Sequence, residues 1–252
     1  MMDPLAGLQP LTRFSNRADD YAKFRPSYPP EAIDFVLTGL GDPTLLTAAD
    51  IGAGTGISSR LLADRGIQVI AIEPNERMRS AAGDDPRIAF VDGEGERTGL
   101  RDKSVNLVAC FQSFHWLRAE SALVEFQRIL KPGGRVALAW NVRDDRDAFT
   151  RGYGRIILDV AGPKANIERF DSAVVLMENP AFRAAESATF ASRQSLRLDE
   201  LLGRARSASY VPLDGPAHER VMNALADLHA AHAGADGMAT LVYQTKAYRA
   251  DM

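Results

Sequence analysis

Three glycines lie close together in the segment ADIGAGTGIS, residues 49–58, between a predicted strand and a predicted helix. Glycine at these positions lets a ligand approach the backbone closely and permits turns that other residues disfavour. Twenty-one residues after Gly52, an apolar run ends in Glu73. A carboxylate there can accept hydrogen bonds from both ribose hydroxyls of an adenosine that lies across the strand ends. We expect nucleoside contacts from Gly52, Ala53, Gly54, Glu73 and Pro74.

The spacing of the glycines bears on which nucleoside cofactor would bind. A dinucleotide fingerprint has glycine at its first, third and sixth positions, and the sixth position here is Ile57. The glycines instead occupy the first, third and fifth positions, after Asp50. A nicotinamide-dependent oxidoreductase is therefore the alternative rather than the first hypothesis. Two structural explanations also stay open, a simple strand-to-helix turn for the glycines and a helix-capping role for Glu73.

The acid followed by G-x-G-x-G resembles the first motif of the class I S-adenosylmethionine-dependent methyltransferase family. More narrowly, four further segments look like its small-molecule branch, the trans-aconitate methyltransferase-like proteins with a type 11 methyltransferase domain. These segments are YAKFRPSYP (21–29), GEGERTGL (93–100), QSFHW (112–116) and LKPGGRVALAWN (130–141). The resemblance covers residues 14–141. It implies an enzyme that uses S-adenosyl-L-methionine and releases S-adenosyl-L-homocysteine.

The resemblance also implies further cofactor contacts. In this family the residues after the third strand hold the adenine, which corresponds here to Glu94 and Gly95, with Glu94 in place of the usual shorter acid. Met78 could lie against the adenine face, or it could pack in the core. The N-terminal segment that closes over the donor contributes Tyr21, Arg25 and Tyr28. Arg25 could pair with the cofactor carboxylate or an acidic substrate, or simply stack between the two tyrosines.

Methyl transfer from a sulfonium requires an aligned acceptor and the exclusion of water, and a base only where the nucleophile carries a proton. A carboxylate acceptor needs no base. After the predicted fourth strand, Gln112 could contact the methionine moiety, and His115 is the candidate base because histidine titrates near neutrality. The alternative for His115 is a histidine packed in the core. The predicted acceptor-binding residues are Tyr28, Trp116, Trp140 and Asn141, and Trp140 could equally belong to the core.

Hydrophobic periodicity indicates the elements that must position these residues. The predicted strands are 45–52, 67–73, 87–91, 104–111, 135–141, 188–198 and 238–250. The predicted helices are 31–40, 55–66, 75–82, 120–130, 146–162, 170–177, 198–207 and 216–233. Their alternation predicts an α/β fold, a doubly wound, Rossmann-like sheet that is mostly parallel, with helices on both faces and an antiparallel last strand. Such sheets bind ligands at the carboxyl ends of their strands, where the chemical residues fall.

The 252 residues, 46% hydrophobic and 25% charged, are predicted to form a single domain. Within it we expect a lid and first helix (1–44), a cofactor-binding core (45–141), a helical insertion with the sixth strand (142–237) and a last strand (238–252). The insertion is where this fold usually carries acceptor specificity. No motif within it identifies the acceptor.

The charge pattern bears on the partners. The net charge of −3 is evenly spread, which argues against nucleic acid and membrane surfaces as partners. One cysteine and the absence of a signal sequence predict a cytoplasmic protein. The histidines of the C-terminal half lack nearby metal-ligand partners, so no metal is expected.

Of 25 arginines, Arg25 alone falls in a motif expected to face the site. We expect a small-molecule acceptor, such as a carboxylate; the alternative is a non-catalytic protein that binds S-adenosylmethionine. The oligomeric state is left open.

Overall fold

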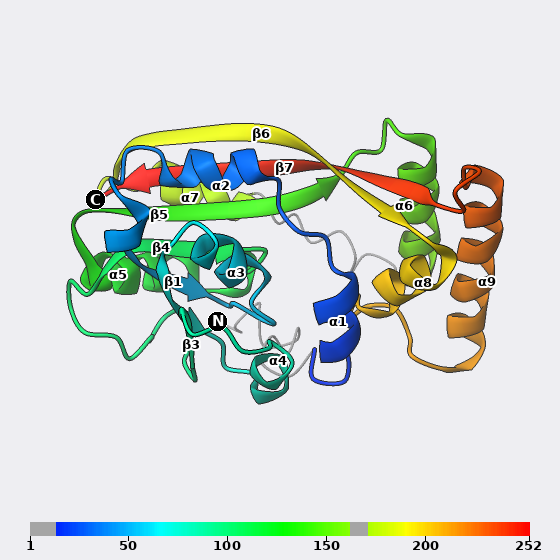
Figure 1. The fold of residues 1–252 in the computed structure, drawn as a ribbon, viewed down its shortest axis with the longest axis horizontal. Helices are drawn as coiled ribbons and strands as arrows, with labels where there is room; N and C mark the ends of the chain where they lie inside the picture. Colours follow the sequence, from blue (N-terminus) through cyan, green and yellow to red (C-terminus); the bar gives the residue numbers. More distant parts are fainter. Residues whose placement is uncertain (1–13, 162–170) are drawn as a thin grey trace, which may run out of the picture.

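The computed structural model describes residues 14–161 and 171–252, built around one seven-stranded sheet (Figure 1). The strands are β1 (Thr47–Ile51), β2 (Gln68–Ile72), β3 (Ile88–Val91), β4 (Val105–Phe111), β5 (Leu130–Arg143), β6 (Arg183–Leu196) and β7 (Ala239–Asp251). Their order is β3-β2-β1-β4-β5-β7-β6. The first five strands are parallel, and β7 runs antiparallel to both β5 and β6. The predicted fold class is confirmed.

Helices cover both faces of the sheet and one of its ends. They are α1 (Ala18–Phe24), α2 (Pro30–Leu37), α3 (Ile57–Ala63), α4 (Glu76–Ser80), α5 (Ala119–Ile129), α6 (Ala148–Ala161), α7 (Asp171–Met177), α8 (Leu198–Arg206) and α9 (Gly215–His232). Helices α2 and α3 pack on one face, and α5 and α7 pack on the other.

Strand β5 shows why both faces of the sheet are covered. Its side chains alternate between the faces, as the two-residue period of a strand requires. Val136, Leu138 and Trp140 lie in the cluster beneath α5 and α7, whereas Ala137 and Ala139 lie beneath α2 and α3. All five are fully buried, which explains the unbroken apolar run in the sequence.

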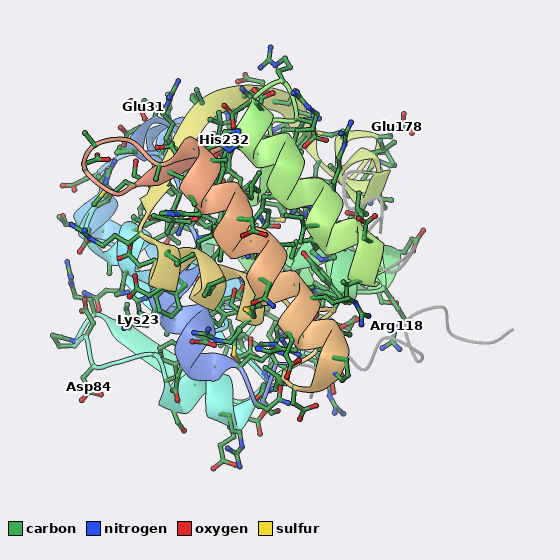
Figure 2. All side chains as sticks on the ribbon, turned by 90° about the vertical axis from the view of Figure 1, so that its right-hand side faces the viewer. Lys23, Glu31, Asp84, Arg118, Glu178 and His232 are labelled. Atoms are coloured by element: carbon green, nitrogen blue, oxygen red, sulfur yellow. The ribbon has the colours of Figure 1, made fainter. Side chains whose placement is uncertain are left out.

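A separate layer of helices lies beyond the carboxyl ends of the parallel strands, on the right of Figure 1. Viewed from that side, α6 and α9 lie side by side in front, with α8 and α1 next to them (Figure 2). Buried apolar side chains of α6, α8 and α9 form their own cluster with the first half of β7. The guanidinium of the buried Arg17 donates to the carbonyls of Arg206, Ala208 and Val211 at 2.5, 2.8 and 2.6 Å. These bonds fasten α1 to the end of α8.

The predicted strands and helices are present, with one further helix and two strands that are longer than expected. Helix α1 was not predicted, because seven residues carry too little periodicity. Strand β6 begins at Arg183 rather than at 188, since its first five residues are exposed and show no apolar alternation. Strand β5 spans 130–143 rather than 135–141. Residues 1–13 of the predicted lid and 162–170 of the predicted insertion lie outside the described residues.

Candidate active site

The glycine loop follows β1 and is held close to the neighbouring strands. Gly52 and Gly54 have φ angles of +65° and +58°, a region that side chains with a Cβ disfavour. A Cβ at Gly52 would lie 2.6 Å from the Cβ of Ser113, and one at Gly54 would lie 3.3 Å from Cε of Met78. Gly52 and Ala53 donate their amides to the carbonyl of Ile72. The loop therefore presents bare backbone at the strand ends, as a nucleoside site requires.

Glu73 follows β2 and reaches across to the same loop. Its Oε2 accepts the Gly54 amide at 2.9 Å, and its Oε1 accepts the Asn75 amide at 2.9 Å. Burial raises the pKa of Glu73, against the effect of these hydrogen bonds. Helix α4 is capped by the Asn75 side chain, so Glu73 is not the capping residue. Each carboxylate oxygen has a second lone pair, which leaves capacity for two hydroxyl donors.

Asp50 lies under the loop and holds the start of α3. It is fully buried, and its Oδ2 accepts the hydroxyls of Ser58 and Ser59, both at 2.6 Å. Burial raises the pKa of Asp50 to about 6, because the charged form loses its water and the two serines only partly replace it. The sequence placed Asp50 before the glycines but gave it no role.

The residues predicted to hold the adenine lie beside the loop. Met78 is buried with its methyl group against Gly54, a position that fits both adenine contact and core packing. A Cβ at Gly95 would lie 2.6 Å from Cδ1 of Leu117 and 2.9 Å from Cγ2 of Ile51, so this turn packs tightly against the end of β1. Glu94 is half-buried in the same turn.

A cavity lies between the glycine loop, the strand ends and the α1–α8 layer. Seven residues predicted from the sequence to contact cofactor or acceptor line it together: Tyr21, Arg25, Tyr28, Gly52, Ala53, Gln112 and Asn141. They come from four separate parts of the first 141 residues. The fold therefore assembles one site from positions that the sequence keeps apart.

The wall formed by α1 and the turn after it is held by aromatic and polar contacts. The Arg25 guanidinium stacks on the Tyr21 ring at 4.7 Å and donates to the Ser207 carbonyl at 2.9 Å. The Tyr28 ring is buried against Phe111, with 4.9 Å between ring centroids. Burial is the main cause that raises the pKa of Tyr28 well above its usual range, so its hydroxyl stays neutral.

Gln112 and Asn141 connect the ends of β4 and β5. Gln112 has a φ of +60°, a left-handed conformation that costs a non-glycine residue about 1–2 kcal/mol. Its Nε2 donates to the Asn141 carbonyl at 3.2 Å, while Asn141 Nδ2 donates to the Ser27 carbonyl. Strain of this kind persists where the surrounding structure fixes it, often at functional sites.

Three predicted residues form a separate group. His115, Trp116 and Trp140 are absent from the described lining of this cavity. Trp140 is fully buried in the core, and its Nε1 donates to Nδ1 of His115 at 3.2 Å. An indole can only donate, so a neutral His115 ring carries its proton on Nε2. This arrangement argues against His115 as a general base. Trp116 stacks near His115, with 4.7 Å between ring centroids.

Arg204 of α8 also lines the cavity, and the sequence reasoning missed it. It is 5% exposed. One signal was available, because Leu201 and Ala205 mark the apolar face of this helix and position 204, three residues after Leu201, lies beside that face. A buried arginine is unusual, and it needs either a buried partner or a ligand.

Two findings concern the described part of the chain as a whole. Within residues 14–161 and 171–252, no group of three or more His, Cys, Asp or Glu residues could hold a metal ion. No helix in those ranges has the length and apolar character needed to cross a membrane.

Comparisons with known proteins agree with this geometry. The family model described as methyltransferase domain matches residues 49–138. An uncharacterized methyltransferase of Schizosaccharomyces pombe is 30% identical over 190 residues, 75% of each chain. An uncharacterized methyltransferase of Mycobacterium tuberculosis is 39% identical over 148 residues, 57% of this chain and 58% of that one, so the match spans little more than half of that relative.

Among solved structures, a protein from Anaeromyxobacter dehalogenans provisionally named a type II methyltransferase has the same fold. The TM-score is 0.69 at 21% sequence identity, covering 90% of this chain and 98% of that one. The chain belongs to the class I S-adenosylmethionine-dependent methyltransferase family.

Proposed function

We propose that this protein transfers a methyl group from S-adenosyl-L-methionine to a small-molecule acceptor, with S-adenosyl-L-homocysteine as the second product. The observation that carries the proposal is the meeting of the Glu73 carboxylate with the bare backbone of Gly54, 2.9 Å apart, in the loop whose Gly52 and Ala53 line the cavity. Family membership supports a methyl donor rather than a nicotinamide cofactor at this loop.

The donor groups of the site fit this cofactor. Glu73 is a buried acceptor with spare lone pairs for ribose hydroxyls, and the loop has room only for backbone at Gly52. Arg25, fixed by Tyr21 and the Ser207 carbonyl, offers a guanidinium for the carboxylate of the methionine moiety. When bound, the cofactor supplies a methyl group already activated on a sulfonium.

The residues of the chain then need to align the acceptor and exclude water. Helices α1 and α8, linked through Arg17, form a wall of the cavity with Tyr21 and Arg204. Gln112 and Asn141 present polar atoms at the strand ends. A base is not required for a carboxylate oxygen, whose ordinary pKa of about 4 keeps it ionised at neutral pH. Such an acceptor does not need His115, whose Nδ1 accepts the hydrogen bond from Trp140.

Calorimetry with S-adenosylmethionine and S-adenosylhomocysteine tests the proposal. We expect both to bind, and Glu73→Gln to weaken binding roughly 10- to 100-fold, since a hydrogen bond to a charged group contributes about 1.5–3 kcal/mol. Glu125→Gln is the matched control, because Glu125 is equally buried and its hydrogen bonds among the described residues go to Thr98 and Arg128.

Two outcomes would contradict the proposal. Binding of a nicotinamide dinucleotide without binding of S-adenosylmethionine would favour the oxidoreductase alternative. Tight binding of S-adenosylmethionine without a methylated product from any of a broad panel of small acceptors would favour a non-catalytic binding protein.

A further inference from the structure

Arg204 is a buried cation whose hydrogen-bonding capacity is only partly used within the described structure, where Tyr243 is its side-chain partner. Its Nε and Nη1 are buried and have no hydrogen-bond partner among residues 14–161 and 171–252. Arg135 is equally buried, at 5% exposure, but it bonds to the Asp251 carboxylate and to the carbonyls of Val36 and Thr38. Arg204 therefore lacks the carboxylate and carbonyl acceptors that hold Arg135.

The surroundings of Arg204 favour its charge but do not neutralise it. Burial opposes the charge, whereas the phenol oxygens of Tyr243, Tyr153 and Tyr210 favour it, so that the pKa of Arg204 lies above its usual value. Among the described ion pairs, none involves Arg204. Arginine stays protonated in proteins, so the site holds a positive charge without a protein anion. The missing group is an anion, and the cavity is where it can enter.

We propose that Arg204 binds a carboxylate of the methyl acceptor and so selects acidic acceptors, an inference that rests on the proposed function. A guanidinium presents parallel N–H donors that match the two oxygens of a carboxylate. Asn141 also lines the cavity, and its side-chain amide has a second N–H for another polar atom of such a molecule.

The position of Arg204 favours the acceptor over the cofactor as the source of the carboxylate. Arg25 stacks on Tyr21, whose Cε1 lies 3.8 Å from the point that a Cβ at Gly54 would occupy, so Arg25 is next to the cofactor loop. Arg204 instead comes from α8, and its tyrosine neighbours come from β7, α6 and the turn after α8. It therefore lies on the wall of the cavity that the cofactor loop does not form.

The test measures binding of small carboxylates to the protein saturated with S-adenosylhomocysteine. The probes are mono-, di- and tricarboxylic acids of three to six carbons, each with its neutral methyl ester. We expect at least one acid to bind to the wild-type protein and its ester to bind far more weakly. Arg204→Met should weaken the acid roughly 30-fold or more, as removal of one partner of a buried charge pair does. Arg204→Lys keeps the charge without the planar fork, and we expect an intermediate loss.

Binding of S-adenosylhomocysteine to the variants shows whether Arg204 binds the carboxylate of the acceptor or that of the cofactor. Arg204→Met should leave the affinity for S-adenosylhomocysteine within about twofold. A loss for S-adenosylhomocysteine, but not for methylthioadenosine, which lacks the amino-acid moiety, would assign Arg204 to the cofactor and overturn the inference. Wild-type protein that binds S-adenosylhomocysteine but none of the acids would overturn it while leaving the proposed function intact.

Thermal unfolding of the ligand-free variants adds a measurement that does not depend on a substrate. We expect Arg204→Met to be at least as stable as the wild type, because it removes an uncompensated buried charge. Arg135→Met, the matched control, should be clearly less stable, because it leaves Asp251 and two carbonyls without their donor. A loss of stability in Arg204→Met equal to that in Arg135→Met would mean that Arg204 is a structural residue.

Discussion

Replacing Asp50 with asparagine should change how the stability of the protein depends on pH. Asp50 is fully buried beneath the glycine loop, and burial raises its pKa from 3.8 to about 6. Asparagine has nearly the same shape and keeps one oxygen that can accept the hydroxyls of Ser58 and Ser59, but it cannot ionise. The substitution therefore isolates the free energy associated with the charge.

The size of the effect follows from the difference between the pKa of Asp50 in the folded protein and its pKa in the unfolded chain. Because the folded protein binds the Asp50 proton more tightly than the unfolded chain does, the carboxyl favours the folded state at low pH. This contribution is fully present below pH 3.8 and is lost as the pH rises through about 6. A difference of about 2 pKa units corresponds to about 3 kcal/mol.

Urea unfolding of wild type and Asp50→Asn between pH 4 and pH 7.5 measures this contribution. Other titrating groups affect both proteins equally, so we compare the difference in unfolding free energy between the two. That difference should shift by up to about 3 kcal/mol in favour of Asp50→Asn as the pH rises, with its midpoint at about pH 5, halfway between the pKa values of the unfolded and folded states. Ser59→Ala, which removes one donor to the carboxylate, should move the upper end of the shift to higher pH. A difference that stays constant over this range would refute a raised pKa for Asp50.

Two further predictions concern the loop and the histidine. Gly52→Ala should lower the unfolding free energy by about 2–5 kcal/mol in urea titrations, because it adds a left-handed backbone penalty to a 2.6 Å contact with Ser113. Gly83→Ala is the control, because Gly83 has a similar φ of +71° and no described heavy atom within 4 Å of the added Cβ. It should lose only the unfolding free energy that comes from the left-handed backbone. Equal losses in the two variants would argue against a close contact at Gly52. His115→Gln keeps an acceptor for the Trp140 indole and should retain methyl transfer within about tenfold, measured as kcat/KM. A loss of 10²- to 10⁴-fold would instead identify His115 as a general base.

Much of the fold could be predicted because each central strand is buried on both faces. Residues 69–72 of β2 and 136–140 of β5 are unbroken apolar runs in the sequence for this reason. Strand β6 lies at the edge of the sheet, and its first half is exposed, so its beginning at Arg183 left no periodic signal. Helix α1 is held by the long-range bonds of Arg17 to the end of α8, which no local pattern in the sequence records.

The meeting of Glu73 with the glycine loop could also be predicted, because it depends on local order along the chain. The glycines directly follow β1 and Glu73 directly follows β2, and parallel neighbouring strands bring the two together. His115 and Trp140 could not be placed in the same way. Side chains at the end of a strand alternate between faces, and a shift of one residue decides whether an aromatic ring faces the cavity or the core.

The acceptor side of the cavity could not be predicted in this way, because Arg204 belongs to no sequence motif. The glycine loop and Glu73, the predicted nucleoside contacts, lie within a family match at residues 49–138, where spacing carries the information. Arg204 lies outside that match, and nothing about its neighbours in the sequence gives it a partner. The role of Arg204 was inferred from its burial and from the absence of an anionic partner among the described residues. Both features are seen only in the folded chain. Proteins of this family that share the loop can therefore differ in acceptor through a single buried charge, and substitutions at position 204 should change acceptor choice while leaving cofactor affinity intact.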